Sequence, residues 1–144
     1  MTVQNRSLER GLAILDCFRP GVGLLSHREV VERTGLPKPT VTRLLLTLQQ
    51  CGYVEQDAAS RAWRLGVPVL SLARALSVSS PLREALAPLI ERLARETHTI
   101  IGFGALHGTD IVYLEAHNGD PRRPERRVGA GMRAPVATTS VGRA

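Results

Sequence analysis

The stretch TGLPKPTVTRLL, residues 34–45, limits the fold more than any other, because a glycine and two prolines directly precede a helical pattern. Glycine is the usual residue at a left-handed helix end. Proline is tolerated at the first position of a helix, and the residue before a proline is disfavoured in the helical region. We therefore expect Leu36 and Lys38 to be extended and Pro39 to open a helix. The stretch predicts a stiff turn between two helices.

Local patterns predict where the two helices begin and end. Ser26 and Glu29 form the S-x-x-E pattern of a capping box, so a helix should begin after Ser26 and end at Gly35. The next helix should end at Gly52, and its inner face carries apolar residues at helical spacing. These residues are Val41, Leu44, Leu45 and Leu48. A helix, a glycine turn and a second helix make a helix-turn-helix.

The flanking segments extend this unit. Residues 6–19 predict an earlier helix, with Ser7 as its cap and one apolar face made of Leu8, Leu12, Leu15 and Phe18. Residues 53–56 and 61–65 resemble strands and are joined by the turn DAAS, which predicts a hairpin. Three helices and a hairpin form a winged helix-turn-helix, and we assign it to residues 1–66.

The second half of the chain contains both helical and strand-like patterns, so the whole chain is predicted to belong to the α+β class. Residues 67–80 should form a linker helix, and Ser80 should cap another helix that begins at Pro81. The inner face expected for that helix consists of Leu82, Leu86, Leu89, Ile90 and Leu93. Strands are expected at 100–106 and 111–116, with a third near Val128.

The outer face of the helix after Gly35 carries the candidate DNA-binding residues. Arg43 can make two hydrogen bonds to a guanine edge in the major groove. The positive end of the helix dipole and free backbone N–H groups favour phosphate. The candidates are Ser26, Lys38, Pro39, Thr40, Thr42 and Arg43, together with Arg61 beside the hairpin turn. The alternative is that these side chains are only solvated.

Composition fits a nucleic-acid partner but adds little by itself. The net charge is +6 and the sequence pI is about 10.6, as expected for a DNA-binding chain. Lys38 is the only lysine among 19 cationic residues, so 18 are arginine, and we attribute that bias mainly to genomic composition. No apolar run has membrane-spanning length and the N-terminus lacks a signal core. We therefore expect a cytoplasmic protein without membrane attachment.

We expect no catalytic site, metal or cofactor. Cys17 and Cys51 match no zinc or redox spacing. The spacing of His98, His107 and His117 fits no ligand pair on a single helix. The segment TTS at 138–140 lacks the surroundings of a nucleophile and reads better as a helix start.

Several motifs, in their order along the chain, resemble the IclR-type (isocitrate lyase regulator) family of bacterial transcription factors. They are SLERGLAILDCF, LSHREVVERTGLPKPTVTRLLLTLQQCGYVE, WRLG, LAPLIERLARET, IVYLEA and RAPVATTSVGRA. The resemblance implies a winged helix-turn-helix, a linker helix and the first part of a GAF-like effector-binding domain at 81–144. It also implies a dimer or tetramer on a palindromic DNA operator.

The resemblance further implies a small organic acid or aromatic metabolite as effector, with Met132, Thr139 and Ser140 near its pocket. The family's effector domain continues beyond the equivalent of Ala144. We therefore expect this chain to bind DNA without responding to an effector, and we expect residues 118–144 to be mobile or ordered only by contact with another chain.

Two classes of function remain open on the residues alone. The first is a sequence-specific DNA-binding regulator. The second is a winged helix used for protein association through the amphipathic helix from Pro81. Apolar residues in excess of what the winged helix needs for its own core predict at least a dimer in either case. They are Leu8, Leu12, Leu15, Leu70 and Leu76.

Overall fold

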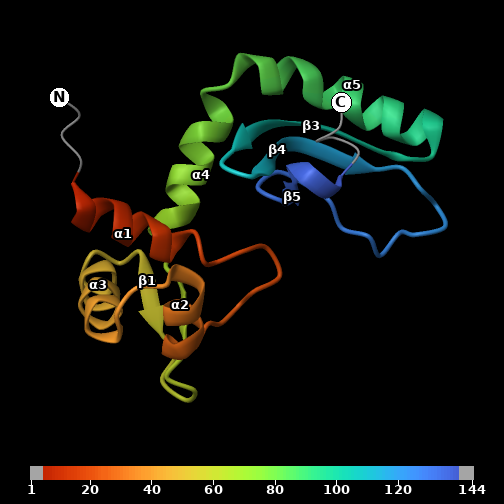
Figure 1. Ribbon diagram of the computed structural model, residues 1–144. Helices are drawn as coiled ribbons and strands as arrows, with labels where there is room; N and C mark the ends of the chain where they lie inside the picture. The colour runs from red at the N-terminus through yellow and green to blue at the C-terminus, as the bar shows by residue number, and fades with distance from the viewer. Residues whose placement is uncertain (1–4, 140–144) are drawn as a thin grey trace. The chain divides into compact units, whose positions relative to one another are not determined.

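The computed structural model describes residues 5–139. The chain forms two compact units, Met1–Arg74 and Ala75–Ala144, and the division falls inside the helix α4 (Pro68–Val78). Each unit is described by itself. Helices and strands occur in both, as the mixed α+β class predicts (Figure 1).

The first unit contains three helices and a two-stranded hairpin. These elements are α1 (Arg6–Leu15), α2 (His27–Thr34), α3 (Lys38–Gln50), β1 (Val54–Gln56) and β2 (Trp63–Leu65). The strands are antiparallel, with Val54 opposite Leu65 and Gln56 opposite Trp63. The winged helix-turn-helix predicted from the sequence is confirmed.

One apolar core holds these elements together. Its buried members are Ile14, Cys17, Leu25, Val30, Val41, Leu45, Val54 and Trp63. Leu25 also pairs with the wing: its N–H donates to the Trp63 carbonyl at 2.8 Å, and the Trp63 N–H donates to the Leu25 carbonyl at 2.7 Å. No pattern in the sequence predicts this bridge, which ties the entry to α2 directly to the hairpin.

The expected cap of α1 was wrong, and the expected inner face was wrong in part: Leu15 and Phe18 pack against the core, but Leu8 and Leu12 do not. Asn5 caps the helix, since its side-chain oxygen accepts from the N–H groups of Ser7 and Leu8. The helix ends at Leu15, and its core residue is Ile14, whereas Leu8 is 61% and Leu12 is 54% exposed. At about 100° per residue, Leu12 and Leu8 lie roughly 160° and 120° around the helix from Ile14. They therefore cannot face the same core.

The turn between α2 and α3 follows the predicted glycine but not the predicted helix start. Gly35 has φ +66°, the left-handed conformation expected there. Pro37 is extended (φ −58°, ψ 140°), and Lys38, not Pro39, is the first residue of α3. The Pro37 carbonyl accepts from Thr40 N–H at 2.9 Å and from Val41 N–H at 3.1 Å. Proline disfavours a helical residue before it without forbidding one, and these two bonds favour the helical turn.

The second unit is a helix on a three-stranded antiparallel sheet. It contains α5 (Pro81–Thr97), β3 (Ile100–His107), β4 (Asp110–Asn118), β5 (Arg133–Pro135) and the short 3-10 helix η1 (Val136–Thr138), with strand order β3-β4-β5. Ser80 caps α5 as predicted, and α5 contacts β3 and β4 (Figure 1). The third strand lies at 133–135, not near Val128, because these residues pair with 110–112 of β4.

The predicted inner face of α5 was wrong in part. Ile90 is buried as expected, but Leu82 is 61% exposed and Leu89 is also exposed. Arg83 occupies the sheet-facing stripe instead, since it lies seven positions before Ile90 and thus only about 20° from it around the helix. Its guanidinium forms a 2.7 Å ion pair with the buried Glu115 of β4 and donates to the Leu114 carbonyl at 3.0 Å.

Candidate nucleic-acid interface

The two faces of α3 differ sharply in exposure. Val41 and Leu45 are fully buried in the core, and Leu44 and Leu48 pack against it. On the opposite side Lys38, Pro39, Thr42 and Arg43 are exposed, and Thr40 is half-buried. The inner and outer faces agree with the sequence pattern. The core therefore holds α3 rigidly while its first turns remain open to a partner.

Two cations on this face are not engaged within the protein. Among the described residues, neither the Lys38 ammonium nor the Arg43 guanidinium forms a hydrogen bond or an ion pair. By contrast, Arg28 pairs with Glu32 and Arg64 pairs with Glu55. Lys38 and Arg43 can therefore meet an anion or a base edge without first breaking a contact of their own.

The N-terminus of α3 offers fewer free amides than expected. Pro39 has no N–H, and the Thr40 N–H already donates to the Pro37 carbonyl. Lys38 carries the one amide in this turn that has no partner among the described residues. Any affinity for phosphate here must therefore come largely from the Lys38 ammonium and the helix dipole.

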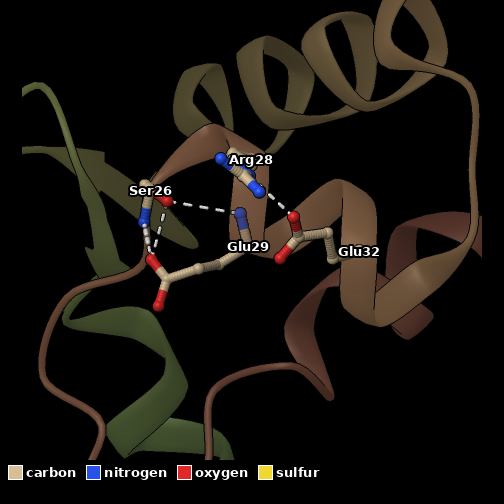
Figure 2. A network of polar contacts seen from close by, with 4 residues as sticks. All are labelled: Ser26, Arg28, Glu29 and Glu32. Atoms are coloured by element: carbon tan, nitrogen blue, oxygen red, sulfur yellow. Dashed lines mark hydrogen bonds and ion pairs between the residues drawn. The ribbon is translucent and has the colours of Figure 1, made fainter.

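Ser26 is committed to the capping box (Figure 2). Its N–H and its hydroxyl both donate to Glu29 Oε2, at 2.8 and 2.7 Å, and its Oγ accepts from the Glu29 N–H at 3.2 Å. The hydrogen bond from the Ser26 hydroxyl, followed by the one from its N–H, lowers the pKa of the Glu29 carboxyl. A phosphate contact by Ser26 stays a prediction, and that phosphate must compete with Glu29.

The capping box predicts a pH-dependent term in the stability of the first unit. Because the folded pKa of Glu29 is below its ordinary value of 4.5, the stabilisation is complete above that value and is lost as the pH falls through the folded pKa. Glu29→Gln keeps a capping side chain but cannot titrate. We expect the difference in urea midpoint between the wild type and Glu29→Gln to shrink as the pH is lowered from about 6 to about 3.

Ser26→Ala serves as the matched control, since it removes the largest cause of the shift. In that background the pH dependence contributed by residue 29 should be smaller. If the difference in urea midpoint between the wild type and Glu29→Gln stays constant over this pH range, the pH-dependent stabilisation does not come from Glu29.

A contact between α2 and α3 was not anticipated from the sequence. His27 Nε2 lies 2.9 Å from Thr42 Oγ1, and the same hydroxyl lies 3.1 Å from the Lys38 carbonyl oxygen. His27 is the first residue of α2, and Thr42 is on the exposed face of α3. No periodicity indicates such a pair, because it depends on how the two helices cross.

Arg61 lies at the tip of the wing, between β1 and β2 and outside both strands. Arg61 was expected to open the second strand, but it lies in the turn with a left-handed backbone (φ +58°). Two bonds hold it there: its N–H donates to the Asp57 carbonyl at 2.9 Å, and its carbonyl accepts from Gln56 Nε2 at 3.0 Å. The Asp57 carboxylate accepts from the hydroxyl and N–H of Ser60, which lowers the pKa of Asp57.

The second unit contains a hollow of about 460 Å³ around two of the three residues expected near an effector, Met132 and Thr139. Ser140 lies outside the described residues. Thr139 follows η1 with an extended backbone, and its hydroxyl donates to the Pro135 carbonyl at 2.7 Å. The helix expected to start at Thr139 or Ser140 would lie outside the described residues. The lining also includes Ile100, Tyr113, Arg126 and Arg127. A mixed apolar and cationic lining suits an organic anion.

Residues 5–139 contain neither a candidate metal site nor a candidate membrane-spanning helix. No group of three or more His, Cys, Asp or Glu side chains there is arranged to hold a metal ion. No helix in that range combines the length and the apolar character needed to cross a membrane.

This chain is similar to known proteins in both sequence and fold. Residues 7–58 match the family model described as the IclR helix-turn-helix domain. The transcriptional regulator TsaQ1/TsaQ2 of Comamonas testosteroni is 35% identical over 138 residues, which are 94% of this chain and 49% of that protein. The Pca regulon regulatory protein of Pseudomonas putida is 32% identical over 137 residues, 95% of this chain and 46% of that protein.

A solved structure agrees with the sequence relatives. The crystal structure of an IclR family transcriptional regulator from Brucella abortus is 37% identical, with a TM-score of 0.82, and the match covers 99% of this chain and 53% of that one. The chain thus spans about half the length of the relatives it matches.

Proposed function

This chain belongs to the IclR-type family of transcriptional regulators, and from that premise we propose that it binds double-stranded DNA sequence-specifically through α3. The observation that carries the proposal is the exposed first part of α3. There Lys38 and Arg43 have no ionic partner among the described residues, while Val41 and Leu45 anchor the helix in the core. An anchored helix with unengaged cations is what insertion into the major groove requires.

Each contact has a distinct role in this proposal. Arg43 reads a guanine edge, and Lys38 contacts phosphate beside Pro39 and Thr40. Ser26 contributes a weaker phosphate contact from the start of α2, because Glu29 competes for its protons. Arg61 reaches the backbone or the minor groove from the wing. Phosphate contacts position the protein, and base contacts specify the sequence.

The protein acts as a dimer or a larger assembly in this proposal. Leu8, Leu12, Leu70 and Leu76 are all exposed large apolar residues, and burial against another copy would remove them from water. Paired α3 helices would then read a palindrome whose half-sites lie about 34–36 Å apart or a multiple of that distance. Sedimentation of a monomer at micromolar concentration, with single half-site footprints, would contradict this assembly.

We propose that the hollow around Met132 and Thr139 is part of a pocket for a small organic acid or aromatic effector. The apolar and arginine-rich lining supports it. The chain spans only about half of its relatives, so we expect this form to bind candidate acids weakly or not at all. Calorimetry with a panel of organic acids tests this, and micromolar binding would show that the pocket is already complete.

The main proposal is tested by DNA binding as a function of salt. A preferred sequence is first selected from random duplexes with the 144-residue chain, and its affinity is then measured by fluorescence anisotropy. Affinity should fall steeply with salt, because each phosphate contact contributes about −0.9 to the slope of log K against log salt. If the chain instead functions in protein association through its apolar faces, binding to DNA will be weak and without sequence preference.

The wing gives a separate prediction. Arg61→Ala should lower the salt slope by about one unit, the value for one lost phosphate contact. Arg64→Ala is the matched control, since Arg64 lies in the same hairpin but is paired with Glu55 at 3.0 Å. An unchanged slope for Arg61→Ala would mean that this arginine is only solvated.

A further inference from the structure

The hydroxyl of Thr42 is held from two sides within the protein. It lies 2.9 Å from His27 Nε2 and 3.1 Å from the carbonyl oxygen of Lys38 one turn earlier in α3. Thr42 itself is exposed, and it directly precedes Arg43 on the proposed DNA-reading face. The two contacts decide which part of this side chain is available to a partner.

The number of protons available to Thr42 Oγ1 determines the direction of both of its hydrogen bonds. A threonine hydroxyl has a single proton. The Lys38 carbonyl has none and can only accept, so that proton must go to the carbonyl if both contacts are hydrogen bonds. His27 Nε2 must then carry its own proton and donate it to Thr42 Oγ1. Neutral histidine protonated at Nε2 and the imidazolium both satisfy this arrangement.

These two contacts use the hydroxyl proton and one of the two acceptor sites of Oγ1, so towards a base the hydroxyl can only accept one further bond, whereas the Cγ2 methyl takes part in neither contact. To donate to a base edge, the hydroxyl must break its hydrogen bond to the Lys38 carbonyl. A change of the Thr42 rotamer would also break the hydrogen bond from His27. The methyl has no such commitment. In the major groove the matching partner is the C5 methyl of thymine, which is the apolar feature that distinguishes this base.

Resting on the proposed function of α3, we infer that Thr42 recognises a thymine through methyl–methyl contact and not through its hydroxyl. His27 is the positioning residue that holds the side chain in this rotamer. This adds a thymine preference next to the guanine preference given by Arg43, at one position in each half-site.

The test removes the two methyl groups independently. In the selected operator, each thymine is replaced in turn by deoxyuridine, which lacks only the C5 methyl. Affinities are measured for the wild type, for Thr42→Ser, which keeps the hydroxyl, and for Thr42→Val, which keeps the methyl and the side-chain shape.

We expect one thymine per half-site at which uracil weakens wild-type binding about fourfold, the value for burying one methyl group. Thr42→Val should show the same uracil penalty, whereas Thr42→Ser should show none at that position. His27→Ala should reduce the penalty, and His27→Gln should restore it, because the glutamine amide can donate from a position near that of Nε2. Thermal melting of each variant confirms that it is folded.

The contrary results are equally distinct. Specific binding without any uracil penalty, or a penalty that survives Thr42→Ser, overturns the methyl contact. Loss of the thymine preference in Thr42→Val shows that the hydroxyl does the reading and overturns it as well. A full penalty in His27→Ala overturns the role of His27. If the wild type has no preferred DNA sequence at all, the proposed function itself fails, and the inference fails with it.

Discussion

Leu45→Ala is expected to destabilise the first unit by about 3–5 kcal/mol. Leu45 is 0% exposed and lies on the inner face of α3, in the same core cluster as Val41 and Trp63. The substitution removes apolar contacts and leaves a cavity whose surroundings relax only partly. A loss of this size is a large fraction of the stability of a small unit, and the orientation of α3 depends on the same core.

Trp63 makes the measurement specific. It is the only tryptophan in the chain and is buried in this core, so its fluorescence during urea unfolding reports on the first unit. The matched control is Leu46→Ala, the next residue of the same helix, which is 50% exposed. We expect Leu46→Ala to lower the free energy of unfolding by well under half of the amount for Leu45→Ala. Equal losses for the two variants would show that the inner face of α3 is wrongly assigned.

Arg43→Ala is expected to weaken binding to the preferred operator by about 1–3 kcal/mol, roughly 5- to 150-fold, and to relax the preference at one base position. The guanidinium has no partner among the described residues, so its removal breaks no contact in the free protein. Stability should therefore change little, and the loss should appear only in the complex.

Lys38→Ala is the matched comparison, since it removes a cation from the same face of the same helix. It should weaken binding to all DNA about equally and lower the salt slope by about one unit, as expected for a phosphate contact. Binding of both variants to a set of single-base operator variants separates the two roles. If Arg43→Ala leaves the pattern of base preference intact, Arg43 does not read a base.

The parts of the fold that were predicted correctly depend on neighbours in the chain. The capping box joins Ser26 to Glu29, three residues apart, and Gly35 ends α2 because only a few residue types adopt positive φ easily. The hairpin of β1 and β2 follows from two short strand-like runs on either side of a turn. These features use hydrogen bonds and backbone preferences that act within one turn.

The incorrect details arise where another contact, local or distant, outweighs the preference of a single residue or stripe. Lys38 becomes helical although a proline follows it, because the Pro37 carbonyl accepts two hydrogen bonds from the first turn of α3. Leu82 is exposed although it fits an apolar stripe, because Arg83 reaches Glu115 and the Leu114 carbonyl on the sheet. The spacing of residues along one helix does not indicate which side chains and carbonyl groups of another element will contact it.

The sequence by itself determined the family, the winged helix-turn-helix, the exposed face of α3 and the cations on it. The family follows from the resemblance of several motifs in their order along the chain. The other features follow from periodicity, capping and turn residues, which act over a few positions. Only the tertiary structure decided that Leu25 bridges to Trp63, that β5 lies at 133–135, and that His27 holds the Thr42 hydroxyl. Each of these joins residues 15 or more positions apart. Such a contact depends on how whole elements pack, because side-chain direction is set by the crossing of helices and the register of strands.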